Sequence, residues 1–493
     1  MFLNNKSEKK INYKAVIVAV FFIILFFVAL YLRYKNIDYI NFQNDEYYHL
    51  NTAVGFLKTG HFETWDFVEQ RTLRPYPRAR IFTIQVAASF KLLGINEFAG
   101  RLPALIWGLL LLPLIYFVSY KVSKSHLVSL IAVYTVSFDN MFIWSSRICR
   151  MYSMFAFLAL LFSWLAYKAL NTKNNYKYIY YLLAIITFYL AFITHAEVLV
   201  LAIGFLIYFI LNFFKEFKYK VFTISAIIGG VVIAVYHFFI AKISYLNFIG
   251  WQAKPNWSYI AELFNQFKFE YLGWIVLLAG IIFLFTHKNN LRTYYYCLFS
   301  GPLVYFVWFA DRYAAKKYIL FLIPFIIIIF SDSLYRICSL CFKKQKYAQY
   351  ILLIIILLFA GPYFSWPSVK ENYFFQPARA DWTYSNSQMH NYRDAYNYIA
   401  DNNKNSDPVL IYSKRTYYLE NKALNLVYFT ENTTINDIQE LVKKNKSGWI
   451  VWPQYKARAH LSAKVMKYIQ KNFKKIEPIS NDTHVIIFHW ENN

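Results

Sequence analysis

Apolar runs of roughly 17–22 residues recur along this chain, with short polar breaks between them. A run of this length can cross the hydrocarbon layer of a membrane as a helix. The pattern therefore predicts a polytopic α-helical membrane protein with about eleven transmembrane helices. We place these spans near residues 15–32, 101–121, 125–143, 151–170, 178–194, 197–214, 221–240, 271–286, 293–310, 318–335 and 348–366.

Composition and charge support this interpretation and give the chain a direction across the membrane. Hydrophobic residues make up 58% of the sequence and aromatic residues 21%, which does not fit a soluble protein of this size. The 52 basic and 27 acidic residues give a net charge of +25. Much of the basic excess lies in alternate breaks, as in cytoplasmic loops. We therefore expect a multi-pass protein of the plasma or inner membrane with a cytoplasmic N-terminus, and no nucleic-acid partner.

Two breaks are longer than turns, and both are expected on the outer side. Residues 33–100 form the first outer loop, and residues 241–270 form a second outer segment. Within the first loop, Ile81–Gly94 is apolar but short for a full crossing. We predict an amphipathic helix lying along the membrane surface, because a true span would invert every later loop. Residues 1–366 would form the transmembrane domain.

From about residue 367 the chain becomes polar, and an odd number of spans would leave residues 367–493 outside the cell membrane. Strand patterns alternate there with helical patterns, which predicts a small extracytoplasmic α/β domain. The strands are expected at Pro408–Ser413, Gly448–Trp452 and His484–Trp490, and the helices at Asn391–Asn402, Thr434–Lys444 and Ala459–Asn472. Thr434 and Asp437 resemble a capping box at the start of the second helix.

An acidic pair, Asp45 and Glu46, follows the first predicted span. Carboxylates are costly in hydrocarbon, so a pair at the lip of a membrane domain suggests a reaction site that water can reach. One carboxylate could deprotonate an acceptor hydroxyl or amine while its neighbour orients it. Tyr48 and His49 crowd the same turn and would suit contacts with a sugar or with the acceptor. Helix capping after Asn44 is the alternative reading of the pair.

Basic side chains gather on the predicted outer side, where charge bias disfavours them. Fixed cations at a membrane mouth could bind a phosphate or pyrophosphate group, and arginine can grip it with two hydrogen bonds. Contact with lipid headgroups is the competing explanation. Asp139 would pair with one of the arginines, in catalysis or only as a structural ion pair, or contact the acceptor. The candidate phosphate-binding residues are Arg74, Arg78, Arg147, Arg150, Arg312 and Tyr313.

Metal-binding patterns are weak in this sequence. His195 and Glu197 lie close together, but two ligands do not make a site. Cys338 and Cys341 form one isolated CxxC, which would need further ligands to hold zinc. We therefore assign no cofactor with confidence, and the need for a divalent metal stays open.

Four segments give the chain a family resemblance. They are NDEYYHLNTAVGFLKTGHF, SFKLLGINEFAGRLPALIWGLLLLPLIYF, WSSRICRMYSMFAFLALL and DRYAAKKYILFLIPF. With these motifs the chain resembles membrane glycosyltransferases of the C-type superfold. It is most similar to the branch that contains protein O-mannosyltransferases and lipid A aminoarabinose transferases. The resemblance covers the N-terminal half well and the external domain only loosely.

This resemblance implies a polyprenyl-phosphate sugar donor, transfer on the outer membrane face and inversion at the anomeric carbon. By motif position Asp45 would be the general base and Glu46 its acidic neighbour, and Asp139 matches a further acidic position. Arg147 and Arg150 match basic positions before the fourth span, while Arg312 and Tyr313 match a pair near the lipid phosphate. Many relatives have an acidic residue where Tyr152 stands here.

Three other functions remain open at the level of sequence. A polymerase or ligase would use a glycan linked to polyprenyl pyrophosphate. A transporter of lipid-linked sugars or solutes would need broken helices and charges deep within the spans, whereas the charges here gather at the outer lip. A membrane-tethered binding protein would not need eleven spans. The expected partners are the lipid bilayer, the donor, and an acceptor that is a protein, a lipid or a glycan.

Overall fold

The computed structural model describes most of the chain in separate stretches. The predicted outer segment 241–270, the predicted span 271–286 and nearly all of the predicted span 348–366 lie outside the described residues. The described residues are 13–38, 41–42, 45–235, 290–308, 320–341, 350, 354, 392–403, 406–411, 416–420, 422–430, 432–453, 461–476 and 485–491.

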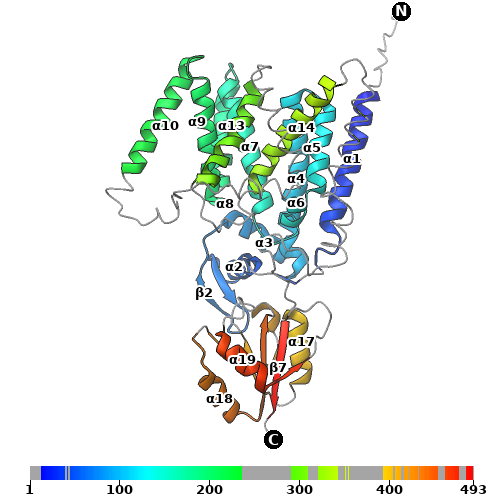
Figure 1. The fold of residues 1–493 in the computed structure, drawn as a ribbon, viewed down its shortest axis with the longest axis vertical. Coiled ribbons are helices and arrows are strands. Elements are labelled where there is room, and N and C mark those ends of the chain that lie inside the picture. The colour runs from blue at the N-terminus through cyan, green and yellow to red at the C-terminus, as the bar shows by residue number, and fades with distance from the viewer. Residues whose placement is uncertain are drawn as a thin grey trace, which may run out of the picture.

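Long apolar helices packed side by side form the upper part of the molecule (Figure 1). Among the described residues, five helices are long and apolar enough to cross a membrane, and two apolar helical segments are shorter. This confirms a largely helical membrane architecture, and the total of eleven spans stays a prediction. The helices of this bundle are α1 (Tyr13–Tyr34), α4 (Glu97–Ser123), α5 (His126–Phe138), α7 (Tyr152–Asn171), α8 (Tyr176–Thr194), α9 (Leu201–Leu211), α10 (Phe217–Val235), α13 (Asn290–Trp308) and α14 (Ile323–Cys341).

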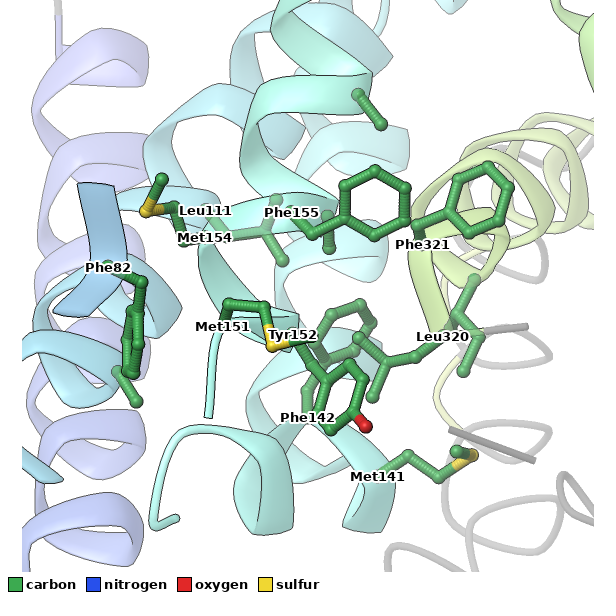
Figure 2. Close-up of a cluster of buried hydrophobic side chains, with 14 of the residues drawn as sticks. Phe82, Leu111, Met141, Phe142, Met151, Tyr152, Met154, Phe155, Leu320 and Phe321 are labelled. Atoms are coloured by element: carbon green, nitrogen blue, oxygen red, sulfur yellow. The ribbon is translucent and has the colours of Figure 1, made fainter. Parts of the chain in front are cut away.

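The bundle buries some apolar faces between helices and leaves others on its surface. Helix α1 exposes Ile17, Phe21 and Phe27, as a helix at the rim of a membrane bundle does. At the opposite extreme, the central cluster of Figure 2 is closed to solvent. There the ring of Phe155 on α7 lies 4.9 Å from that of Phe321, in the turn before α14. These contacts fix α7, whose first residue is Tyr152, within the bundle.

Two helices of the bundle approach each other through glycine. A Cβ atom added to Gly204 on α9 would lie 2.6 Å from the carbonyl oxygen of Cys297 on α13. One added to Gly301 on α13 would lie 2.2 Å from the backbone nitrogen of Gly204. Small residues allow this backbone contact between helices, which is a common packing device in membranes.

A compact layer of two helices and a hairpin lies between the bundle and the C-terminal sheet (Figure 1). It comprises α2 (Glu46–Thr59), β1 (Glu63–Asp66), β2 (Arg71–Pro75) and α3 (Arg80–Leu93), with β1 and β2 antiparallel. Helix α3 confirms the short helix predicted at Ile81–Gly94. Helix α2 touches the hairpin directly, because a Cβ atom at Gly55 would lie 1.9 Å from the carbonyl oxygen of Glu63.

The C-terminal region folds around a five-stranded sheet of order β4-β3-β5-β7-β6. Strands β4, β3 and β5 are parallel, while β7 is antiparallel to β5 and β6. The strands are β3 (Pro408–Ile411), β4 (Asn425–Tyr428), β5 (Ser447–Pro453), β6 (Lys474–Ile476) and β7 (Val485–Glu491). The sequence predicted β3, β5 and β7 and missed the short strands β4 and β6.

Helices cover the C-terminal sheet and explain its alternating side chains. Leu410, Ile450 and Phe488 point to one face, where they pack against α18 (Ile435–Lys444) and α19 (Ala463–Asn472). Val409, Val451 and Ile487 point to the other face, which joins the core that contains α17 (Tyr392–Asn402). The capping box predicted at Thr434 and Asp437 is present. The structure therefore contains the predicted α/β elements, while their placement outside the membrane stays a prediction.

Candidate functional site

The two adjacent carboxylates of the acidic pair have different surroundings. Asp45 directly precedes α2, and 44% of its side chain is exposed. Glu46 is the first residue of α2, and only 3% of its side chain is exposed. Consecutive residues of a helix point about 100° apart, which separates the two groups. Asp45 makes no side-chain hydrogen bond to the end of α2, so the helix-capping reading does not describe it.

Glu46 is held in a buried ion pair with Arg101 of α4. Its two oxygens accept hydrogen bonds of 2.9 Å from Nε and from a terminal nitrogen of Arg101. The same carboxylate accepts the backbone N–H of Cys149 at 2.6 Å. Arg101 also donates to the carbonyl oxygens of Ile37 and Asn41, in the segment that leads to Asp45. This two-pronged pairing places Glu46 as a structural support for its neighbour.

Arg150 faces Asp45 across the site. One terminal nitrogen of Arg150 lies 4.0 Å from a carboxylate oxygen of Asp45, and the other donates to the Asp45 carbonyl at 3.1 Å. Its contacts with the hydroxyl oxygens of Tyr76 and Tyr152 are both long, at 3.5 Å. The Nε atom is buried and has no hydrogen-bond partner among the described residues. Since buried donors are normally satisfied, Arg150 retains hydrogen-bonding capacity for a ligand.

Aromatic rings and a histidine line the same side of α2. The rings of Tyr48 and Tyr76 stack at 5.1 Å, and the guanidinium of Arg74 lies 5.8 Å from the centre of the Tyr48 ring. The Nδ1 atom of His49 lies 3.0 Å from the hydroxyl of Thr83. Burial, and then the charge of Arg150, hold the pKa of His49 well below its usual range. The imidazole is therefore neutral at physiological pH.

The tautomer of His49 follows from its neighbour. The hydroxyl of Thr83 donates to the carbonyl oxygen of Ala79 at 3.4 Å, so the hydroxyl oxygen of Thr83 can accept a hydrogen bond from an N–H at Nδ1 of His49. In that assignment Nε2 is left as an acceptor. This atom is buried and has no partner among the described residues. It is thus a second group in the site that retains hydrogen-bonding capacity.

Arg147 lies only three residues before Arg150 but contacts the end of α1 instead of Asp45. One of its terminal nitrogens donates to the carbonyl oxygens of Leu32, Arg33 and Lys35, and the other donates to that of Asn36. It therefore caps the C-terminus of α1. Arg33 does the same for α5, donating to the carbonyl oxygens at 136 and 137. The structure places Arg147 among carbonyls rather than beside Asp45.

Other sequence candidates lie outside this group. Asp139 caps α6 (Asn140–Ser145) through the backbone N–H of Phe142 and interacts electrostatically with Arg33. Arg78 is exposed, and Arg312 and Tyr313 lie outside the described residues. His195 Nδ1 and a Glu197 oxygen are 3.6 Å apart. Within the described parts of the chain, no three His, Cys, Asp or Glu residues gather as metal ligands.

Several residues that shape the site were missed by sequence reasoning. Arg101 was counted only as the first residue of a predicted span, although a charge at the start of a membrane helix is itself a signal. Tyr76 is not among the candidates that the sequence pattern singles out. Tyr152 was noted only as a departure from the family pattern. The contacts of Arg101 with Glu46 and of Tyr76 with Arg150 join residues 55 and 74 positions apart, which a linear pattern does not reveal.

Comparisons with known proteins give matches at the level of structure. No family model and no curated protein sequence matches the chain. ArnT from Cupriavidus metallidurans, a lipid A aminoarabinose transferase, matches with a TM-score of 0.59 and 10% identity, over 97% of this chain and 98% of that one. Its complex with undecaprenyl phosphate matches with a TM-score of 0.57.

An archaeal enzyme shares the architecture. The oligosaccharyltransferase AglB from Archaeoglobus fulgidus, solved with an inhibitory peptide and a dolichol-phosphate, matches with a TM-score of 0.59 and 10% identity. The match covers 89% of this chain and 70% of that one. ArnT and AglB are membrane glycosyltransferases of the C-type (GT-C) fold, and the chain therefore has this fold.

Proposed function

We propose that this chain is a membrane glycosyltransferase that transfers a sugar from a polyprenyl-phosphate donor to an acceptor on the outer membrane face. The likeness to ArnT, which was solved with undecaprenyl phosphate, supports the donor class. The single observation that carries the proposal is the facing pair of Asp45 and Arg150. A carboxylate open to solvent lies 4.0 Å from a buried guanidinium whose Nε retains hydrogen-bonding capacity.

In this mechanism Asp45 removes the proton of an acceptor hydroxyl or amine as that group attacks the anomeric carbon. The bond between the anomeric carbon and the phosphate oxygen breaks, and polyprenyl phosphate leaves with the bonding electrons. Arg150 holds the leaving phosphate and balances its charge. A single displacement of this kind inverts the anomeric centre. The acceptor can be a protein, a lipid or a glycan.

Neighbouring side chains would position the two substrates. The stacked rings of Tyr48 and Tyr76 offer an aromatic face to the sugar. The Nε2 atom of His49 would accept a hydrogen bond from a sugar or acceptor hydroxyl. Arg74, above the Tyr48 ring, could extend the phosphate site. Asp139 and Arg147 would act indirectly, by fixing the helix ends on which the site is built.

Substitution of Asp45 by asparagine tests the general-base role. We expect transfer from the prenyl-phosphate sugar to fall by about 100-fold or more, because general bases contribute on that order. Asp38→Asn is the matched control, since Asp38 is an exposed carboxylate in the same loop. Both variants should fold and insert like the parent protein. Activity of Asp45→Asn close to that of Asp38→Asn would contradict the mechanism.

The donor class needs its own experiment, because a glycan linked through pyrophosphate is the alternative donor. Mass spectrometry of the lipid that copurifies with the protein separates the two. A single sugar on a monophosphate supports the proposal. An oligosaccharide on a pyrophosphate would replace it with a polymerase or ligase function.

A further inference from the structure

A chain of polar contacts runs from the C-terminal domain to the acidic pair. Tyr418 lies in the 3₁₀ helix η8 (Thr416–Leu419), and its hydroxyl donates to Glu97 of α4 at 2.6 Å. The same hydroxyl accepts the backbone N–H of Phe42 at 2.7 Å. Arg393 of α17 forms an ion pair with Glu97 at 3.5 Å. Two elements of the C-terminal domain thus meet at one carboxylate of the bundle.

Glu97 connects these contacts to the acidic pair through Arg101. It lies one helical turn before Arg101 on α4, and the two charges interact. Arg101 in turn pairs with Glu46 and holds the carbonyl oxygen of Asn41. The segment at residues 41 and 42 is therefore held by Arg101 on one side and by Tyr418 on the other. Asp45 follows three residues later.

Burial makes these contacts stronger than similar contacts on a surface. Tyr418 is 7% exposed and Glu97 is 5% exposed. Burial, and then neighbouring Tyr47 and Glu97, raise the pKa of Tyr418 well above its usual range, so its hydroxyl keeps its proton and remains a donor. A buried carboxylate that loses its donor is costly, so the arrangement favours one fixed geometry.

We propose that Tyr418 and Glu97 are positioning residues through which the C-terminal domain sets the place of Asp45. This inference rests on the proposed function. Neither residue is assigned contact with donor or acceptor. They fix the start of α2, so their loss should displace the base while leaving the phosphate contact of Arg150 in place. The domain is then a working part of the catalytic unit.

Tyr418→Phe and Tyr417→Phe form a matched pair for the test. Each variant removes one hydroxyl from η8, but that of Tyr417 donates only to the carbonyl oxygen of Ile95 among the described hydrogen bonds. We expect Tyr418→Phe to lower kcat about tenfold with an unchanged KM for the donor, since small misplacements of reacting groups are costly. Tyr417→Phe should stay within about twofold. Rates are taken per folded molecule.

Variants of Glu97 add a rescue. Glu97→Gln keeps an oxygen that accepts from Tyr418, so it should retain more activity than Glu97→Ala. Equal kcat values for Tyr418→Phe and Tyr417→Phe would overturn the proposal, as would a change in Tyr418→Phe that is confined to KM. If Asp45→Asn is active, the proposed function itself fails. If Asp45→Asn is inactive and the tyrosine variants agree, only the positioning role fails.

A second feature lies at the other end of the bundle, far along α4 and α7 from Asp45 (Figure 1). A cavity of about 490 Å³ opens there between the ends of α4 and α7, the start of α8 and Leu291 of α13. Three lysines line it, Lys121, Lys124 and Lys168. Its aromatic lining comprises Phe117, Trp164, Tyr167 and Tyr180.

Two of the three lysines lie near aromatic rings of the cavity lining. The ammonium of Lys121 lies 5.3 Å from the Phe117 ring, and that of Lys168 lies 5.4 Å from the Tyr180 ring. Lys124 directly follows α4 and has a positive φ of 60°, a backbone conformation that residues other than glycine rarely adopt. In the portions of the chain that the structure describes, none of the three forms an ion pair with a carboxylate.

We infer that this cavity binds the phosphate headgroup of an anionic membrane lipid. Basic pockets between transmembrane helices suit such headgroups. Aromatic walls at the level of the membrane interface would accommodate the glycerol and the upper acyl chains. The predicted topology places this end at the cytoplasmic leaflet. The site would act on the stability of the bundle, since it lies away from the reacting groups.

Binding is tested with the full protein in nanodiscs of phosphatidylcholine, with phosphatidylglycerol added, and native mass spectrometry as the readout. We expect retained phosphatidylglycerol in the parent protein and about tenfold less in the variant with Lys121, Lys124 and Lys168 changed to glutamine. A variant with the exposed residues Lys91, Lys173 and Lys215 changed to glutamine removes the same number of charges and is the control. Equal retention in both variants would overturn the inference, as would displacement by inorganic phosphate at millimolar concentration.

Discussion

Arg147 and Arg150 lie on one short loop, yet they belong to regions with opposite properties. The first region, here the anchoring cluster, comprises Glu46, Arg101 and Arg147, whose described contacts are mostly short and buried. The second, the open cluster, comprises Asp45, His49, Tyr76, Arg150 and Tyr152. It has contacts of 3.5 and 4.0 Å and two buried nitrogens without a described partner.

The difference teaches how to recognise the reactive residues among many charges. Charged groups that are fully engaged by the protein have nothing left to offer a ligand, whereas an incompletely satisfied group is costly to bury and needs a reason. Type and position in the sequence do not distinguish the two arginines. The two arginines differ in their hydrogen bonds, because Arg147 donates to four carbonyl oxygens and Nε of Arg150 has no described partner. Variants of the two clusters should accordingly separate stability from activity.

The largest effect is expected for Arg101→Leu in the anchoring cluster. The variant leaves Glu46 buried without its partner, which costs about 3–5 kcal/mol of unfolding free energy. Thermal unfolding of the purified protein in detergent measures the loss. Changing both Glu46 and Arg101 to leucine should recover part of it, although the N–H of Cys149 then lacks its acceptor. An unfolding temperature of Arg101→Leu equal to that of the parent would place the pair outside the anchoring cluster.

Arg150→Gln should give the largest effect in the open cluster. We expect transfer to fall by about 100-fold, because the leaving phosphate loses its cation. The unfolding temperature should change little, since the longest contacts of Arg150 are weak. Binding of undecaprenyl phosphate, compared with undecaprenol, is the direct measurement. Undiminished preference for the phosphate would remove Arg150 from the site.

Arg147→Gln provides the reverse pattern and sharpens the comparison. Loss of its hydrogen bonds to the end of α1 should lower the unfolding free energy by about 1–3 kcal/mol. The rate of transfer per folded molecule should stay near that of the parent. Thermal unfolding and the transfer assay are run on the same preparation. A slow variant with normal stability would move Arg147 to the open cluster.

His49 predicts a smaller effect that depends on pH. The unfolded chain binds a proton at His49 near pH 6.5, but the folded protein does not until lower pH, because burial lowers this pKa. The unfolding free energy should therefore fall by roughly 1.4 kcal/mol per pH unit below about pH 6.5 and stay constant above it. Unfolding of the parent and of His49→Gln from pH 5 to 8 measures this slope. Equal slopes would contradict a neutral His49.

Much of the fold follows from local sequence pattern. Periodic apolar runs predict the membrane helices, because span length is fixed by the thickness of the bilayer. The short helix α3 could be predicted because its apolar run is too brief to cross. Thr434 and Asp437 predict the start of α18, since a capping box involves only neighbouring residues. These features depend on contacts close in sequence.

The site was predictable only in part. The pair of Asp45 and Glu46 could be singled out by its place beyond the first span, but its division into an open and a buried carboxylate depends on Arg101, 55 residues away. The role of Tyr418 depends on a partner 321 residues away. Sequence pattern alone also gave Arg147 and Arg150 the same candidate role, because the carbonyls that engage Arg147 belong to α1 and the turn after it.

The stack of Tyr48 on Tyr76, beside the open cluster, depends on the absence of a side chain at Gly55. Because Gly55 has no side chain, the backbone of α2 lies directly against the carbonyl of Glu63. Any larger residue at this position would push the hairpin away from α2. Tyr76 directly follows β2 of this hairpin and would move with it. The rings of Tyr48 and Tyr76 would then move apart and lose their stacking contact. The shape available to a sugar thus depends on a residue that never touches it.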